Sequence, residues 1–233
     1  FIHRVDPDII DMQEVLHHQL EVLKTGLPEY TVVGVGREDG KTAGEYAPIF
    51  FKQAKYTLLD QNTFWLCEKP DSVGMVGWDA ALTRIATWVK LQDKKTGQIL
   101  MVVNTHFDHI GTEARRNSAL LIIEKIKEIV GTSPAILTGD FNVSEDWDAY
   151  KTITNNEFIL KDAHKVAGKR TGVDFTYHNF GKIPAEKCEK IDFIFVTPQI
   201  RVISSYIPFS QLNDTLFLSD HNPEIVELEI EKS

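Results

Sequence analysis

The chain has 233 residues, of which 42% are hydrophobic and 25% are charged, so it can bury one large core, and disorder and a collagen-like repeat are excluded. No window approaches the roughly 20 apolar residues that a transmembrane helix needs. There are 25 Lys and Arg against 34 Asp and Glu, and the resulting net charge of −9 disfavours tight binding to long nucleic acids.

The apolar pattern predicts many strands and two longer helices. Helices are expected at His17–Leu27 and Thr112–Val130, where apolar residues recur at helical spacing. Strands are expected at Ile9–Gln13, Tyr30–Val35, Ile49–Phe51, Tyr56–Leu59, Ile85–Leu91, Ile99–Asn104, Ala135–Thr138, Ile191–Val196, Val202–Tyr206 and Ile225–Ile230. Because many strands follow one another without a helix between them, we predict one α/β domain over residues 1–233, an α/β sandwich of two packed sheets with helices on the outer faces.

Two patterns in the sequence indicate no particular chemistry. Cys67 and Cys188 are far apart and in no metal-ligand spacing, so one disulfide and two free thiols both stay open. Residues 36–42 resemble a phosphate-binding P-loop, but three residues separate the two glycines where that loop needs four. A serine hydrolase has no support either, because no serine lies in a G-x-S-x-G elbow.

The segment from Asn104 to His109 places polar residues directly after a predicted buried strand. One interpretation is that His106 contacts a phosphate above a metal site. The alternative is a zinc site, because His106-x-Asp108-His109-x-Gly111 resembles the second half of the motif in metallo-β-lactamase-like hydrolases. That family would have a histidine where this chain has Asn104, so the two interpretations stay open.

Three further segments carry polar side chains that are candidates for the site. Asp140 and Asn142 follow Gly139 and are two residues apart, so in an extended segment they point the same way and suit a hard cation and a phosphoryl oxygen. Asp192 lies in a predicted core strand, where a carboxylate needs a cation or an imidazole as partner. His221, in a loop before the last strand, is the candidate imidazole and the candidate general base.

Taken in order, five segments resemble the endonuclease/exonuclease/phosphatase superfamily, the fold of DNase I, and most closely its deadenylase and sphingomyelinase branch. They are Gln13-Glu14, Asn104-Thr105-His106, Gly139-Asp140-Phe141-Asn142, Ile191-Asp192-Phe193 and Ser219-Asp220-His221. The resemblance covers almost the whole chain. It implies a four-layer α/β sandwich and metal-dependent hydrolysis of a phosphoester, with one or two Mg²⁺ or Mn²⁺ ions.

The resemblance also implies a role for each matching residue. Glu14 would bind the metal ion. Asp140 and Asn142 would position the attacking water and a phosphoryl oxygen. His221 would be the general base and Asp192 would orient it.

Four other assignments complete the expected site. His106 would donate to the phosphate, and Asp220 would lie beside the metal. Glu45 is expected to match the carboxylate that pairs with the first histidine in DNase-like members. Arg84 is expected to contact the phosphate, by its position in the sequence.

The resemblance also shapes what is expected of the substrate and of the start of the chain. Family members begin with a strand that carries an asparagine near the metal, and we expect such a strand before Phe1 in the native protein. The expected substrate is a small phosphodiester or phosphomonoester, or a short nucleotide, bound by a monomeric protein. The zinc hydrolase and a non-catalytic binding module of the same fold are the alternative functions.

Overall fold

The computed structural model describes residues 1–131, 133–155, 160–209, 211–213 and 216–231, and these contain five helices, one 3-10 turn and fourteen strands. The helices are α1 (Ile2–Val5), α2 (His17–Gly26), α3 (Thr112–Val130), α4 (Asp148–Thr154) and α5 (Ala163–Val166), with the 3-10 turn, η1, at Ala185–Lys187. The strands are β1 (Ile9–Asp11), β2 (Tyr30–Val33), β3 (Ile49–Lys52), β4 (Tyr56–Trp65), β5 (Ile85–Asp93), β6 (Ile99–His106), β7 (Ala135–Asp140), β8 (Lys161–Asp162), β9 (Lys169–Gly172), β10 (Asp192–Val196), β11 (Ile200–Ile207), β12 (Gln211–Asn213), β13 (Leu216–Phe217) and β14 (Ile225–Ile230).

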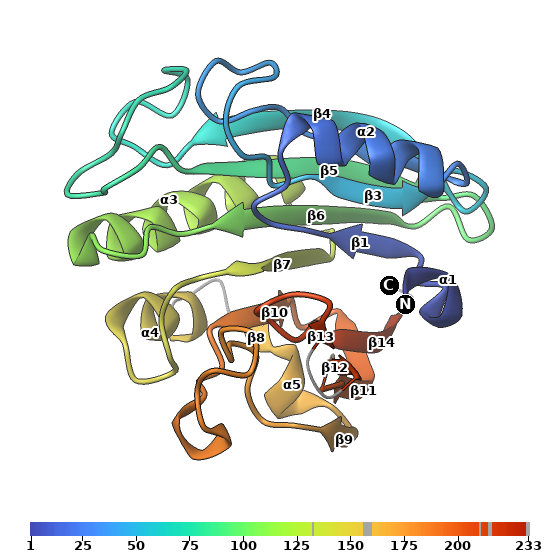
Figure 1. Cartoon of the computed structure of the whole chain (residues 1–233). Coiled ribbons are helices and arrows are strands. Elements are labelled where there is room, and N and C mark those ends of the chain that lie inside the picture. Colours follow the sequence, from blue (N-terminus) through green and yellow to red (C-terminus); the bar gives the residue numbers. More distant parts are fainter. Residues whose placement is uncertain (132, 156–159, 210, 214–215, 232–233) are drawn as a thin grey trace.

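Most of these strands form two facing layers (Figure 1). One layer is a six-stranded sheet in the order β4–β5–β6–β7–β10–β8. Its neighbours are antiparallel except β6 and β7, which are parallel because the long helix α3 connects them. The other layer contains two three-stranded sheets, β1–β3–β2 and β14–β11–β9, in which β1 and β14 are edge strands.

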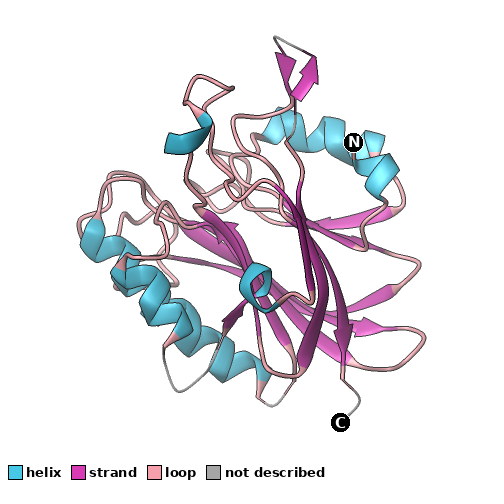
Figure 2. Cartoon of the chain, turned by 90° about the horizontal axis from the view of Figure 1, so that it is seen from below, coloured by secondary structure: helices cyan, strands magenta, loops and turns pink. Residues whose placement is uncertain are grey.

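Three buried clusters separate four layers. Phe50 and Phe51 are neighbours in β3 and point to opposite faces of their sheet. Phe50 packs in the cluster of α2, whereas Phe51 packs between the sheets in the cluster that includes Val102 of β6. On the far side of the six-stranded sheet, Ile122 of α3 packs in the cluster that includes Phe195 of β10. Helices therefore cover both outer faces, as Figure 2 shows, and the predicted four-layer sandwich is confirmed.

Some expectations need correction. Helix α3 has the predicted bounds, but β4 continues to Trp65 instead of ending at Leu59. Asp192 is the first residue of β10 instead of lying inside a core strand. Helix α4 and the short strands β8, β9, β12 and β13 were not expected from the sequence.

The remaining expectations concern the thiols, the membrane and the start of the chain. Cys67 and Cys188 are both free thiols. No helix in the described ranges is long and apolar enough to cross a membrane. The expectation of a further strand before residue 1 stays a prediction.

Candidate active site

Three neighbouring strands bring three of the candidate side chains into one row. In the sheet registers, His106 at the end of β6 lies opposite Asp140 at the end of β7, and Asp140 lies opposite Asp192 at the start of β10. Close backbone approach is needed here, since a Cβ on Gly139 would lie 2.3 Å from the carbonyl oxygen of Thr105. The row therefore follows directly from the register of the buried sheet.

His221 completes this row from the loop before β14. Its Nδ1 atom lies 2.7 Å from Oδ2 of Asp192, and its Nε2 atom lies 4.0 Å from Oδ2 of Asp140. Burial by itself lowers the pKa of His221, but the hydrogen bond to Asp192 and the charges of Asp192, Asp140 and Asp220 outweigh it and raise the pKa from 6.5 to about 9. Asp192 thus fixes the ring and leaves Nε2 directed toward Asp140.

Asp140 is buried among other carboxylates. Burial, and then the charge of Asp192, raise the pKa of Asp140 from 3.8 to about 8. Its Oδ2 atom also lies 3.5 Å from Nε2 of His106. Ligand atoms of Asp140, Asp192 and His221 all lie within 4.8 Å of one another, so this group could hold a metal ion.

A second group, Glu14, Glu45 and His106, also has ligand atoms within 4.8 Å of one another. Burial, and then the positive charges of Arg84 and Arg37, hold the pKa of His106 well below 6.5, so its ring is neutral at pH 7. Glu14 has a left-handed backbone with φ of 59°, and its side chain is 64% exposed. A carboxylate held open in a strained turn is typical of a ligand-binding position.

Asn104 explains how that turn is held. Its amide nitrogen donates to the carbonyl oxygens of Met12 at 2.7 Å and Pro48 at 2.9 Å, and its amide oxygen accepts from Gln13 at 2.7 Å. The Asn104 side chain is fully buried in the six-stranded sheet and holds the two residues directly before Glu14. The zinc hypothesis would have a histidine at this position. Asn104 instead uses all its polar side-chain atoms in hydrogen bonds that join the two layers.

Two arginines flank the neutral histidine, and the sequence identified only one of them. Arg84 is buried, and its Nη1 atom has no hydrogen-bond partner among the described residues. Arg37, which was missed, donates to Glu45 at 2.6 Å and lines the same small recess as Arg84 and His106. The available signal was a glycine-rich loop running from Arg37 to Glu45, whose sequence resembles only an imperfect P-loop.

Asn142 and Asp220 lie near these groups in different ways. The segment after β7 is not extended as expected, because Asn142 is left-handed with φ of 49°. Its backbone N–H donates to Asp140 at 2.8 Å and its side chain donates to the carbonyl of Phe107 at 2.9 Å. Partial burial, and then the charges of Glu45 and Asp220, raise the pKa of Glu14.

The structure does not assemble the alternative zinc site. The Asp108 carboxylate accepts backbone N–H groups of Ala81, Leu82, Ile110 and Gly111, and these bonds outweigh burial and lower its pKa to about 2. His109 is exposed, and its Nδ1 atom lies 3.1 Å from Nη2 of Arg84. In the part of the chain that the structure describes, no candidate metal group combines His106 with either residue.

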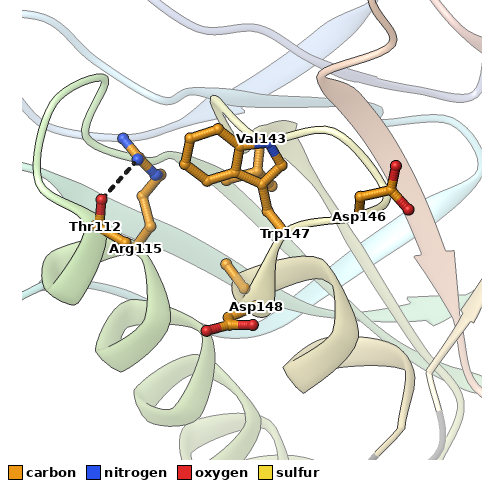
Figure 3. A pocket seen from close by; sticks show the side chains of 7 residues that line it. Thr112, Arg115, Val143, Asp146, Trp147 and Asp148 are labelled. Carbon is orange, nitrogen blue, oxygen red and sulfur yellow. Dashed lines mark hydrogen bonds between the residues drawn. The ribbon is translucent and has the colours of Figure 1, made fainter.

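A cavity of about 300 Å³ lies beside this edge, between the start of α3 and the loop that leads into α4 (Figure 3). Arg115 is buried, and its guanidinium carbon lies 5.0 Å from the centre of the Trp147 ring. It also donates to the carbonyl of Asp108 at 2.9 Å. Arg115 thus supports the loop after His106 from behind, and the cavity contains none of the groups in the row.

Comparisons with known proteins find matches that cover almost the whole chain. The family model described as "Endonuclease/Exonuclease/phosphatase family" matches residues 1–221. An endonuclease/exonuclease/phosphatase from Bacteroides vulgatus is 64% identical, with a TM-score of 0.97 over 99% of this chain and 88% of that chain. The mannosyl-6-phosphatase of Bacteroides thetaiotaomicron is 37% identical, with a TM-score of 0.92 over 98% of this chain and 88% of that chain. The catalytic domain of human Nocturnin, at 18% identity and a TM-score of 0.77 over 98% of this chain and 83% of that chain, shares the fold.

Proposed function

This chain belongs to the endonuclease/exonuclease/phosphatase family, whose members are phosphoric ester hydrolases, and on that basis we propose that it is a divalent-metal-dependent phosphoesterase that uses His221 as general base. The observation that carries the proposal is the 2.7 Å contact of His221 with Asp192, with the opposite ring nitrogen 4.0 Å from Asp140. A phosphoester resists attack because it is anionic, so a hydrolase must orient a water and offset the charge on the phosphoryl oxygens.

The base function follows from the tautomer. Asp192 accepts the proton on Nδ1, so in the neutral ring the lone pair is on Nε2, where a water between His221 and Asp140 would donate its proton. The Asp192 charge then stabilises the imidazolium that forms. Asp140 would accept from the same water and orient it toward the phosphorus.

The residues present suit a hard divalent cation. Glu14, Glu45 and Asp140 offer carboxylate oxygens, and the candidate metal groups of the described residues include no cysteine, a donor set that favours Mg²⁺ or Mn²⁺. Burial, and then the charge of Asp192, raise the pKa of Asp140, and a bound cation would oppose that rise. When bound, the ion would offset charge on the phosphoryl oxygens and on the leaving oxygen.

For the substrate we propose a phosphomonoester of a small polyhydroxylated alcohol, a sugar phosphate. A monoester is dianionic, and Arg84 and Arg37 place two guanidinium groups around the neutral His106. The Nη1 atom of Arg84 is buried without a hydrogen-bond partner among the described residues, and a phosphoryl oxygen that enters the recess would supply one. The name of the Bacteroides thetaiotaomicron relative makes mannose 6-phosphate the first substrate to try.

A substrate panel tests this function. Phosphate release would be measured from mannose 6-phosphate, glucose 6-phosphate, a nucleoside monophosphate and bis(p-nitrophenyl) phosphate, with Mg²⁺, Mn²⁺ or EDTA. We expect metal-dependent hydrolysis that prefers a sugar monoester and falls at least ~10²-fold in Asp140→Asn. Asp146→Asn changes an exposed carboxylate of the next loop and serves as the control. Activity that survives both EDTA and Asp140→Asn would rule the proposal out.

A further inference from the structure

A buried ion pair lies next to the His221–Asp192 contact and has no direct part in the proposed chemistry. The Nζ atom of Lys190 lies 2.8 Å from Oε2 of Glu224, and the two side chains are only 7% and 3% exposed. Lys190 precedes β10, in the six-stranded sheet, and Glu224 precedes β14, in the other layer. The pair therefore joins the two layers at the edge where the candidate site lies.

Each end of the pair is attached to one member of the His221–Asp192 contact. The Lys190 ammonium also donates to the backbone carbonyl of Asp192 at 2.7 Å and lies 4.0 Å from the centre of the Phe193 ring. Glu224 comes three residues after His221 in the loop that leads into β14. One side chain thus links the backbone of Asp192 to the segment that carries His221.

Glu224 is itself fixed on its other side. Its Oε1 atom lies 3.2 Å from the hydroxyl of Ser205, which lies 2.8 Å from Nδ1 of His164. A hydroxyl has one proton, so Ser205 donates to the carboxylate and accepts from the His164 ring. Burial raises the pKa of Glu224, and the Lys190 charge opposes that rise. Both carboxylate oxygens are therefore held in place.

Stability gives no reason for charges at this place. Replacing a buried ion pair with apolar side chains of similar volume is often neutral or stabilising, so holding the layers together does not by itself require charges. What an apolar pair lacks is a directed hydrogen bond to the Asp192 carbonyl. Building on the proposed function, we propose that Lys190 is a positioning residue, and that its pair with Glu224 sets Asp192 against His221 at hydrogen-bond distance.

The double variant Lys190→Met, Glu224→Leu tests this role, because it leaves no unpaired charge in the core. We expect it to fold and melt cooperatively, with kcat for the best panel substrate reduced about 10- to 100-fold, since displacement by about 1 Å costs on that order. KM should change less than about twofold, because neither residue touches substrate. The single variant Lys190→Arg can still donate to the Asp192 carbonyl and to the Glu224 carboxylate, so it should keep most of the wild-type kcat.

A spectroscopic measurement separates this proposal from the proposed function. In the full chain without metal or substrate, the proton between His221 and Asp192 should give a far-downfield NMR signal, assigned by its loss in His221→Gln. The signal should disappear in the double variant. It should persist in Arg201→Met, Glu229→Leu, a control that removes an exposed 2.8 Å ion pair between β11 and β14.

The outcomes are distinct. A double variant that folds and keeps both the signal and wild-type kcat would overturn the positioning role. Loss of the signal in a protein whose wild type hydrolyses no phosphoester would support the positioning role and count against the proposed function alone.

Discussion

Replacing Asp192 with asparagine is the most informative single change at the candidate site. The substitution keeps the shape of the side chain but removes the charge that lies 2.7 Å from Nδ1 of His221. Although burial lowers the pKa of His221, its neighbours, Asp192 first among them, raise it from 6.5 to about 9. That rise corresponds to about 3 kcal/mol of extra stabilisation of the imidazolium over the neutral ring.

The same free energy sets the expected loss of activity. If the imidazolium forms in the transition state, losing about 3 kcal/mol lowers kcat by about 10²-fold. With the charge gone, burial is opposed only by the charges of Asp140 and Asp220, so the pKa of His221 falls from its raised value. The basic form is then present at lower pH, so the acid limb of the pH–rate profile should move to lower pH while the plateau drops.

The assay is kcat and kcat/KM against pH for the best panel substrate at saturating metal. Circular dichroism and the melting temperature of the variant would show whether the fold is kept. A variant with a wild-type plateau and an unmoved acid limb would refute the assignment of His221 as base and of Asp192 as its partner.

Three further outcomes follow from the geometry. Asn104→Asp loses both N–H donors that hold the turn before Glu14, so Mg²⁺ affinity should fall about 10-fold, as measured by metal-dependent shifts in melting temperature. The control Thr105→Val loses a buried hydrogen bond to the Ile85 carbonyl and should leave Mg²⁺ affinity unchanged. In calorimetry the metal-free protein should lose stability as pH rises from 6 to 9. Folding raises the pKa of Asp140 from 3.8 to about 8 and that of His221 from 6.5 to about 9, so folding binds protons in this range. A stability that does not change with pH would contradict this, and Mg²⁺ should reduce the slope. Arg84→Lys should raise KM for a monoester several-fold more than for a diester in steady-state kinetics, and equal effects would exclude a role in recognising the dianion.

The long buried elements were predictable because the side chains that they bury produce a regular apolar pattern in the sequence. Helix α3 agrees with its predicted bounds, since one face packs on the six-stranded sheet and glycines stand before and after it. Strand β4 was predicted too short because Asp60 and Asn62 interrupt its apolar pattern. Their backbones still pair with β5, and pairing through the backbone leaves no trace in the side chains. Strand β9 is wholly exposed and has no apolar signal at all.

The residues of the candidate site also divide into those that the sequence pattern marks and those that it does not. His106, Asp140 and Asp192 stand at strand ends, where a polar residue next to an apolar run marks each of them in the sequence. Arg37 gives no such signal, because it reaches the site through a glycine-rich loop whose path depends on tertiary contacts. The match of Lys190 to Glu224 is also invisible, since 34 positions separate two residues that meet only when the layers pack.

The precision of the site therefore has two sources. His106, Asp140 and Asp192 are placed by strand register, and a slip of one residue would turn each side chain to the opposite face, so the buried sheet itself holds them. Glu14 and His221 come from loops that pair with other segments only through isolated β-bridges, Val15 with Tyr46 and His221 with Tyr177. Each of these loops is also held by a polar side chain that crosses between the layers, Asn104 for the first and Lys190 for the second. A change in either of these two side chains should thus alter catalysis or metal binding while the row in the sheet stays intact.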